Sequence, residues 1–156
     1  MGQSVIFPAG AAGLHQLVDE LLKCRSVLLS THVAPDPDAI GSCFALAEGL
    51  RRSGIAVQVY LCDALPERMR AFLPEGISWR GEAPEGETFD AVVVVDTASR
   101  VRIGGEVERV YACGPISFNI DHHASNIGWA TYNYIDTRAA AAALFVSELL
   151  GVLERS

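Results

Sequence analysis

The chain has 156 residues, half of them hydrophobic, and its 12 Lys and Arg against 19 Asp and Glu give a net charge of −7. This length favours one compact domain, residues 1–156, that buries a real core. No apolar run approaches the roughly eighteen residues of a membrane span, and the start of the chain lacks the basic and long apolar regions of a signal peptide. We therefore expect a soluble, cytoplasmic protein with no membrane partner, and its acidity argues against binding to long duplex DNA.

The first part of the chain alternates helical and strand-like patterns. Residues 13–22 place leucine and valine at helical spacing, with His15 off the apolar face and expected in solvent. A short apolar run at 26–31 predicts a strand. Residues 40–50 then resume a helical period that ends near Gly54.

The same alternation continues to the end of the chain, interrupted by a segment rich in turn residues at 66–84. The further elements that we predict are strands at 56–61, 90–96 and 116–120, an edge strand at 130–135 and a helix at 139–150. Strands alternating with helices predict an α/β fold with a doubly wound, mostly parallel sheet flanked by helices.

The four cysteines, Cys24, Cys43, Cys62 and Cys113, are far apart and form no C-x-x-C pair. Such spacing does not suit a metal site. We expect small buried hydrophobes in a reducing compartment.

Acidic and histidine side chains gather after three of the predicted strands. They are His32, Asp36 and Asp38 after the first central strand, Asp96 after the valine run, and Asp121, His122 and His123 after the strand at 116–120. Ligands bind outside the carboxyl ends of the strands in open α/β sheets, because loops from several strands converge there. We expect the three clusters to meet in space.

Facing carboxylates and imidazoles would repel one another unless cations neutralise them. Mixed oxygen and imidazole ligands without thiolate favour Mn²⁺ or Mg²⁺, with Zn²⁺, Co²⁺ or Fe²⁺ as alternatives. Two ions about 3.5 to 4 Å apart would suit phosphoryl chemistry by a bridging hydroxide, with Asp96 as the bridging carboxylate. Structural roles stay open: Asp38 as a helix N-cap, Asp96 as a turn residue, and histidines that simply pack.

Three stretches, HVAPDPDAIGS, VVVVDTAS and NIDHHASN, resemble in this order the first three motifs of the DHH phosphoesterase superfamily. They span residues 32–126. The stretches PDPDAIGS, ALPERMRAFLP and DTASRVRIG are most similar to its nanoRNase branch, which is related to the RecJ exonucleases. The resemblance implies a Rossmann-like DHH catalytic domain, and a hydrolase that prefers Mn²⁺. Its substrates would be short oligoribonucleotides or the 3'-phosphate of a nucleoside 3',5'-bisphosphate.

Carried over by position, the resemblance implies two metal ions that share Asp96. One would be held by His32, Asp36 and Asp96, and the other by Asp38, Asp96 and His122.

The remaining site residues are also assigned by the resemblance. His123 would face the substrate phosphate and stabilise charge in the transition state, while Asp121 would orient the histidine pair. With Asp96, these two form the implied catalytic set. Asn126 and Arg102 are weaker candidates for substrate contact, with solvated surface roles as the alternative.

The sequence departs from the family pattern in several places. The family's last metal-binding Asp lies downstream of where this chain ends, and Asp136 does not match it. Alanines at 139–143 stand where relatives carry Ser, Thr and Glu, and Pro37 replaces a common Gly. The family's second, smaller domain, which carries a Gly-rich basic substrate-binding motif, has no counterpart in these residues, so we expect the chain to resemble half of a two-domain enzyme.

Two other functions remain open. The missing ligand and the alanine run favour a noncatalytic DHH module that binds metal or nucleotide. A DHH hydrolase of pyrophosphate, polyphosphate or cyclic dinucleotides is the other alternative. The sequence sets neither the physiological metal nor the oligomeric state.

Overall fold

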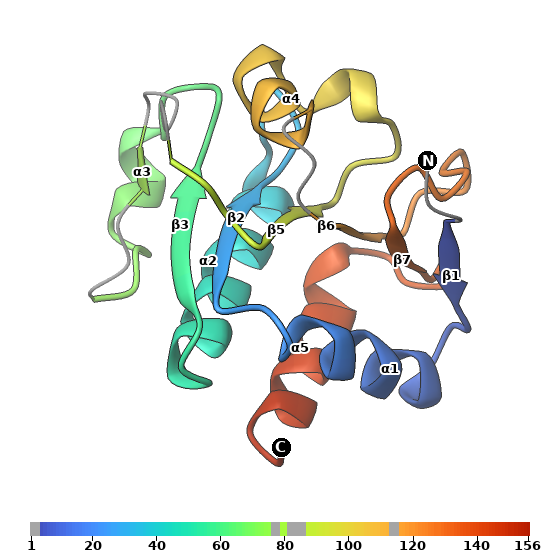
Figure 1. Ribbon diagram of the computed structural model, residues 1–156. Helices are drawn as coiled ribbons and strands as arrows, with labels where there is room; N and C mark the ends of the chain where they lie inside the picture. Colours follow the sequence, from blue (N-terminus) through green and yellow to red (C-terminus); the bar gives the residue numbers. More distant parts are fainter. Residues whose placement is uncertain (1–3, 76–78, 81–86, 113–115) are drawn as a thin grey trace.

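The sheet is built from seven strands in the part of the chain that the computed structural model describes, residues 4–75, 79–80, 87–112 and 116–156. The strands are β1 (Val5–Phe7), β2 (Ser26–Ser30), β3 (Ala56–Tyr60), β4 (Trp79–Arg80), β5 (Ala91–Val95), β6 (Ile116–Asp121) and β7 (Tyr132–Ile135). They lie in the order β1-β7-β6-β5-β2-β3-β4, and every pair is parallel (Figure 1).

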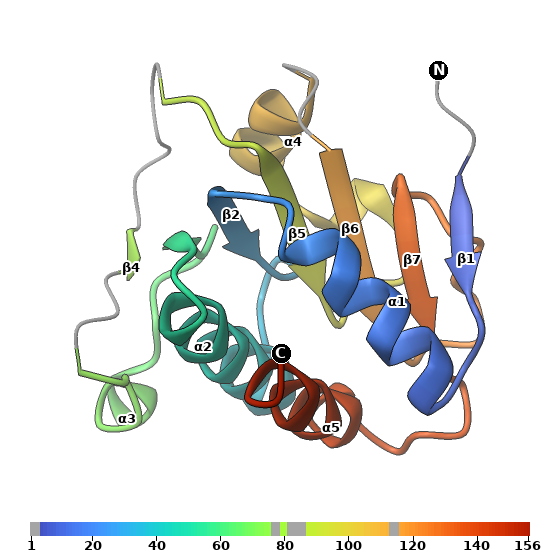
Figure 2. The same ribbon diagram turned by 60° about the horizontal axis from the view of Figure 1, so that its bottom comes forward.

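Helices cover both faces of this sheet. They are α1 (Ala11–Leu21), α2 (Pro37–Arg52), α3 (Glu67–Arg70), α4 (Gly105–Ala112) and α5 (Ala142–Leu153), with a 3₁₀ turn, η1, at Arg100–Arg102. Figure 2 shows α1, α2 and α5 on one face and α4 on the other. The predicted doubly wound α/β fold is therefore confirmed, and no helix of the described residues is long and apolar enough to cross a membrane.

The valines of β5 explain why this strand lies at the centre. Val93 and Val95 join the core beneath α1, α2 and α5, while Val92 and Val94 join a second core beneath α4. Successive side chains of a strand point to opposite faces, so a strand covered on both sides must be apolar throughout.

Helix α2 begins at the turn that carries the first acidic cluster. Asp36 is its N-cap, with Oδ1 accepting the backbone N–H of Ala39 at 3.0 Å, and Pro37 is the first helical residue. Proline suits that position because its fixed φ is helical and its missing N–H would have no partner there. The alternative that Asp38 is the N-cap of this helix is wrong, since Asp36 takes that place.

Several expected elements differ from the structure. The prediction that β7 is an edge strand is wrong. Strand β1, which was not predicted, pairs with β7 on the side away from β6 and takes the edge position. Helix α5 begins three residues later than the helix predicted from residue 139, and β1, α3 and α4 were not predicted. Of the helical leucines at 13–22, Leu22 is 38% exposed because α1 has ended before it.

The cysteines and His15 differ in their exposure to solvent. Cys24 and Cys43 are buried and Cys62 is half-buried, whereas Cys113 lies outside the described residues. His15 is exposed, and its Nδ1 donates to the carbonyl of Ala11 at 2.8 Å.

The strand order creates a switch point between β2 and β5. From β2 the chain moves to β3 and β4 on one side, and from β5 it moves to β6 and β7 on the other. Loops at such a point diverge and leave a crevice outside the carboxyl ends of the strands. The acidic and histidine clusters follow β2, β5 and β6, and they therefore surround this crevice.

Candidate metal centre

Asp96 lies at the centre of the polar cluster. It directly follows β5, is 2% exposed, and has a left-handed backbone with φ 55°. Its Oδ2 lies 3.8 Å from Nε2 of His32, and its Oδ1 lies 3.2 Å from Nε2 of His122. The carboxylate thus faces two imidazole rings that come from the ends of two other strands.

Both rings present the nitrogen that a metal needs. Nδ1 of His32 lies 2.8 Å from the carbonyl of Val33, and Nδ1 of His122 lies 3.2 Å from the carbonyl of Ala139. Carbonyl oxygen only accepts, so we assign the ring protons to Nδ1. Each Nε2 then directs a lone pair toward Asp96, which is the usual arrangement of a metal-bound histidine.

The loop that carries His32 is held from three sides. The hydroxyl of Thr31 donates to the carbonyl of Val95 at 2.8 Å, and the N–H of Val33 donates to the carbonyl of Arg102 at 2.8 Å. The N–H of Ala34 donates to the carboxylate of Asp63. Ala34 has φ 51°, a strained value for a residue with a Cβ, so these bonds fix an unfavourable backbone.

Asp36 and Asp38 differ in what their carboxylates contact. Asp36 is exposed and uses Oδ1 to cap α2, and one of its carboxylate oxygens lies within 4.8 Å of ligand atoms of His32 and Asp96. Asp38 instead points to α5: its Oδ2 accepts the N–H of Ala142 at 2.7 Å and its Oδ1 that of Ala143 at 3.0 Å. Oδ1 also accepts the hydroxyl of Ser42 at 3.4 Å. Each carboxylate oxygen has two lone pairs, so these bonds leave one free on Oδ2.

His123 is oriented differently from its neighbour. Its Nδ1 donates to Oδ1 of Asp121 at 2.7 Å, and Asp121 is fully buried. This hydrogen bond raises the pKa of His123 above its usual value, against the opposing effect of desolvation. Nδ1 also lies 3.8 Å from Oδ1 of Asp96, but it already carries the proton shared with Asp121, so this nitrogen is a poor metal ligand.

Among the described residues, two sets of three side chains have ligand atoms within 4.8 Å of one another, and they share Asp96. The first set is His32, Asp36 and Asp96, and the second is Asp96, His122 and His123. Oδ1 of Asp96 is buried and accepts no hydrogen bond from the described residues. Burial, followed by the negative charges of Asp38 and Asp36, raises the pKa of Asp96. A divalent cation would relieve both the unpaired oxygen and the crowded charge, so the side chains fit such an ion.

Arg102 and Asn126, predicted with His123 to contact the substrate, are also near the cluster. Arg102 is exposed, with one guanidinium nitrogen 3.4 Å from Nδ1 of His32. Asn126 donates from Nδ2 to Asp121 and to Asn119, at 2.6 Å each. Asn119 was missed from the sequence, although an asparagine inside a predicted central strand was a signal for it.

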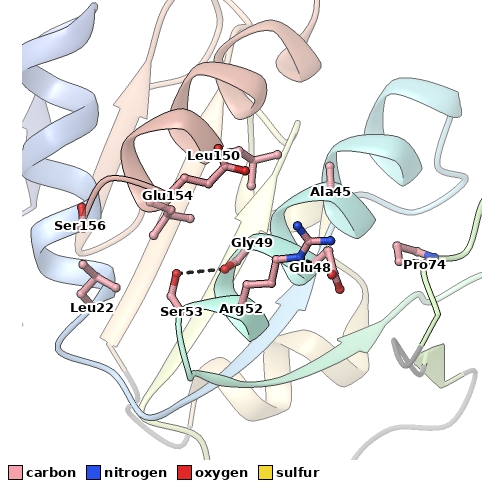
Figure 3. Close-up of a pocket in the computed structure, with 11 residues that line it drawn as sticks. Leu22, Ala45, Glu48, Gly49, Arg52, Ser53, Pro74, Leu150, Glu154 and Ser156 are labelled. Carbon is pink, nitrogen blue, oxygen red and sulfur yellow. Dashed lines mark hydrogen bonds and ion pairs between the residues drawn. The ribbon is translucent and has the colours of Figure 1, made fainter.

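A cavity of about 590 Å³ lies elsewhere on the molecule, between the second half of α2 and the end of α5 (Figure 3). Its lining includes Gly49 and Leu150, where the two helices cross closely. Asp36 and Asp38 stand at the opposite end of α2. The chemically promising side chains and this cavity are therefore separate features.

Comparison with known proteins places this site in a family. The model described as DHH family, N-terminal domain, matches residues 26–155. The bifunctional oligoribonuclease and PAP phosphatase NrnA of Thermus thermophilus is 32% identical over 140 residues, which cover 88% of this chain and 41% of that protein. The NrnA of Bacillus subtilis is 30% identical over 136 residues, which cover 86% of this chain and 41% of that protein.

A solved structure, that of an exopolyphosphatase-related protein from Bacteroides fragilis, has the same fold. Its TM-score is 0.79 at 20% sequence identity, over 92% of this chain and 44% of that one. The chain thus spans less than half the length of the relatives it matches. The family match covers β2 to β7, the switch point and every side chain of the cluster, and it shows that this chain belongs to the DHH family, as an N-terminal domain of that family.

Proposed function

We propose that this chain is the catalytic domain of a metal-dependent phosphoesterase that acts on short oligoribonucleotides or nucleoside 3',5'-bisphosphates. The observation that carries the proposal is the carboxylate of Asp96, which is buried, accepts no hydrogen bond at Oδ1 from the described residues, and lies between Nε2 of His32 and Nε2 of His122. The names of the NrnA relatives support the substrate class. The cytoplasmic location expected from the sequence stays a prediction.

The side chains would have separate roles in binding metal and in contacting the substrate. His32, Asp36 and Asp96 would hold one divalent ion, while Asp96 and His122, joined by Asp38, would hold a second. Ions bound there would neutralise phosphate charge and lower the pKa of water, with Mn²⁺ as the preferred ion. His123, whose Nε2 is not used by Asp121, would contact a non-bridging phosphate oxygen, and Arg102 would attract the anionic substrate to the edge of the crevice.

The direct test is release of mononucleotide from a labelled RNA dinucleotide, with and without Mn²⁺. The matched variants are Asp96→Asn and Asp90→Asn, because these two aspartates flank the same strand, β5, at its opposite ends. We expect Asp96→Asn to abolish Mn²⁺-dependent release and Asp90→Asn to retain it. Equal activity of both variants would refute the proposed site.

Metal binding can be measured separately by titrating the chain with Mn²⁺ and following the free ion by electron paramagnetic resonance. We expect two bound ions, and loss of both in Asp96→Asn because each set needs that carboxylate. If the variant kept the normal stoichiometry, the two-metal arrangement would be wrong. Parallel assays with nucleoside bisphosphate, pyrophosphate, polyphosphate and a cyclic dinucleotide would decide the substrate.

A noncatalytic domain is the second candidate, and the contacts of Asp38 favour it. Both oxygens of this carboxylate serve the backbone of α5, which suits a structural role. Metal binding without hydrolysis of any of these substrates, by a chain whose folding has been checked, would support this alternative.

A further inference from the structure

A continuous line of hydrogen bonds runs from the interior of the sheet to His123. It starts at Asn119, which is fully buried in β6. Nδ2 of Asn119 donates to the carbonyls of Val94 and Thr97, at 3.2 and 3.1 Å. Its Oδ1 accepts from Asn126 at 2.6 Å. The amide thus joins β6 to the segment on either side of Asp96 and presents one acceptor toward the loop that follows.

Both amide hydrogens of Asn126 are already used in hydrogen bonds within the protein. Its amide has two hydrogens, and two acceptors lie 2.6 Å from Nδ2, namely Oδ1 of Asn119 and Oδ2 of Asp121. Its own Oδ1 accepts the N–H of Gly128 at 2.9 Å. These contacts make Asn126 an internal link, while the substrate contact expected from the sequence stays a prediction.

Asp121 connects Asn126 to His123 by hydrogen bonds. One of its oxygens accepts from Asn126 and the other from Nδ1 of His123, at 2.6 and 2.7 Å. Since the carboxylate is 0% exposed, water does not compete for either bond. In contrast, the side chain of His123 is 39% exposed, so the line ends at a ring that reaches solvent.

We propose that Asn119 and Asn126 are positioning residues that act through Asp121 to fix the ring of His123, with its Nε2 toward the crevice. A buried carboxylate with one partner removed would rotate or recruit water, and the imidazole would lose its single orientation. The consequence for catalysis rests on the proposed function, in which Nε2 meets the substrate phosphate. The orientation of the ring does not depend on that function.

The chain offers a matched control in Asn133. This residue is the register partner of Asn119 on β7 and is equally buried. Its Nδ2 donates to Ser4, to the carbonyl of Val5 and to the carbonyl of Ala130, which ties β1 to the sheet. Truncating either asparagine removes a buried amide, but the bonds of Asn133 lead away from the site.

The test uses the Mg²⁺-loaded chain and the NMR signal of the His123 Nδ1 proton, which its bond to Asp121 protects from exchange with water. We expect Asn126→Ala and Asn119→Ala to broaden or shift this signal, and Asn133→Ala to leave it unchanged. In the dinucleotide assay, kcat of the first two variants should fall roughly 10- to 100-fold with little change in KM, a size typical of lost supporting contacts.

The outcomes separate the inference from the proposed function. An unchanged signal in Asn126→Ala, or the same change in all three variants, would overturn the positioning role. If Asn119→Ala does not fold, Asn126→Ala decides alone, because Asn126 lies in a partly exposed loop. A chain that hydrolyses nothing would refute the proposed function, while the NMR signal would still support or overturn the link to His123.

Discussion

The contact between Asp38 and α5 predicts a measurable loss of stability when Asp38 is replaced. The residue before α5 is Ala141, which provides no side-chain cap, and the carboxylate of Asp38 takes that role for two N–H groups. Losing a cap costs about 1 kcal/mol, and losing a negative charge at a helix N-terminus costs up to about 1 kcal/mol more. We expect Asp38→Ala to lower the free energy of unfolding by about 2 kcal/mol.

For a chain of this length, that loss corresponds to a fall of about 4 to 8 °C in Tm. The assay is thermal unfolding of the metal-free protein, with Asp19→Ala as the control for the change in net charge, since Asp19 is exposed on α1. Hydrogen exchange at the amides of Ala142 and Ala143 should accelerate in Asp38→Ala. A Tm equal to that of Asp19→Ala would refute the capping role.

The same variant tests whether Asp38 also binds metal. Mg²⁺ that binds the folded chain raises Tm by mass action, whatever the starting stability. If Asp38 is both cap and ligand, Asp38→Ala should show a smaller Mg²⁺-induced rise than the unmodified chain. An equal rise would mean that Asp38 is a cap alone.

Three further predictions concern stability and reactivity. The backbone N–H groups of Arg25 and Ser26 lower the pKa of Asp90. Its contribution to the free energy of folding is therefore complete above the unfolded pKa of about 3.9, and it is lost as the pH falls through the lower pKa of the folded state. Asp90→Asn should therefore lower Tm at neutral pH and make Tm decrease less steeply as the pH is lowered. An unchanged dependence of Tm on pH in acid would contradict this. Gly13→Ala should destabilise the chain by about 3 kcal/mol, because the new Cβ would lie 1.7 Å from the carbonyl oxygen of Pro8. Gly41→Ala meets nothing within 4 Å and should stabilise α2 by about 1 kcal/mol, so equal effects of the two substitutions would refute the packing argument. Burial raises the pKa of the Cys43 thiol, so a thiol reagent should modify it only as fast as the protein unfolds, and rapid labelling of the folded chain would contradict this.

The central strands and the location of the site were predictable from the sequence because their signals are local. A run of valines such as β5 suits a strand covered on both faces, and polar residues directly after such strands must gather at one edge of a parallel sheet. The doubly wound architecture follows from the same alternation of strands and helices.

The less predictable features depend on contacts between distant residues. Strand β1 has three residues, and its pairing with β7 joins positions more than 120 residues apart, which no local pattern reveals. The cap of α5 comes from Asp38, likewise over 100 residues away, so the alanines before the helix gave no start signal. The use of Asn126 inside the protein depends on how the loop after β6 folds back onto Asn119 and Asp121, and on the carbonyl of Thr97, 29 residues away and 3.4 Å from its Nδ2.

The backbone of Ala34 has a consequence for attempts to make this protein more robust. Its left-handed φ of 51° costs roughly 1 to 2 kcal/mol in a residue with a Cβ, and glycine would escape that cost. A selection for heat resistance alone would therefore favour Ala34→Gly. The same change would enlarge the range of conformations open to the His32 loop, so a screen that scored only thermal survival would tend to collect sturdier proteins with poorer metal sites.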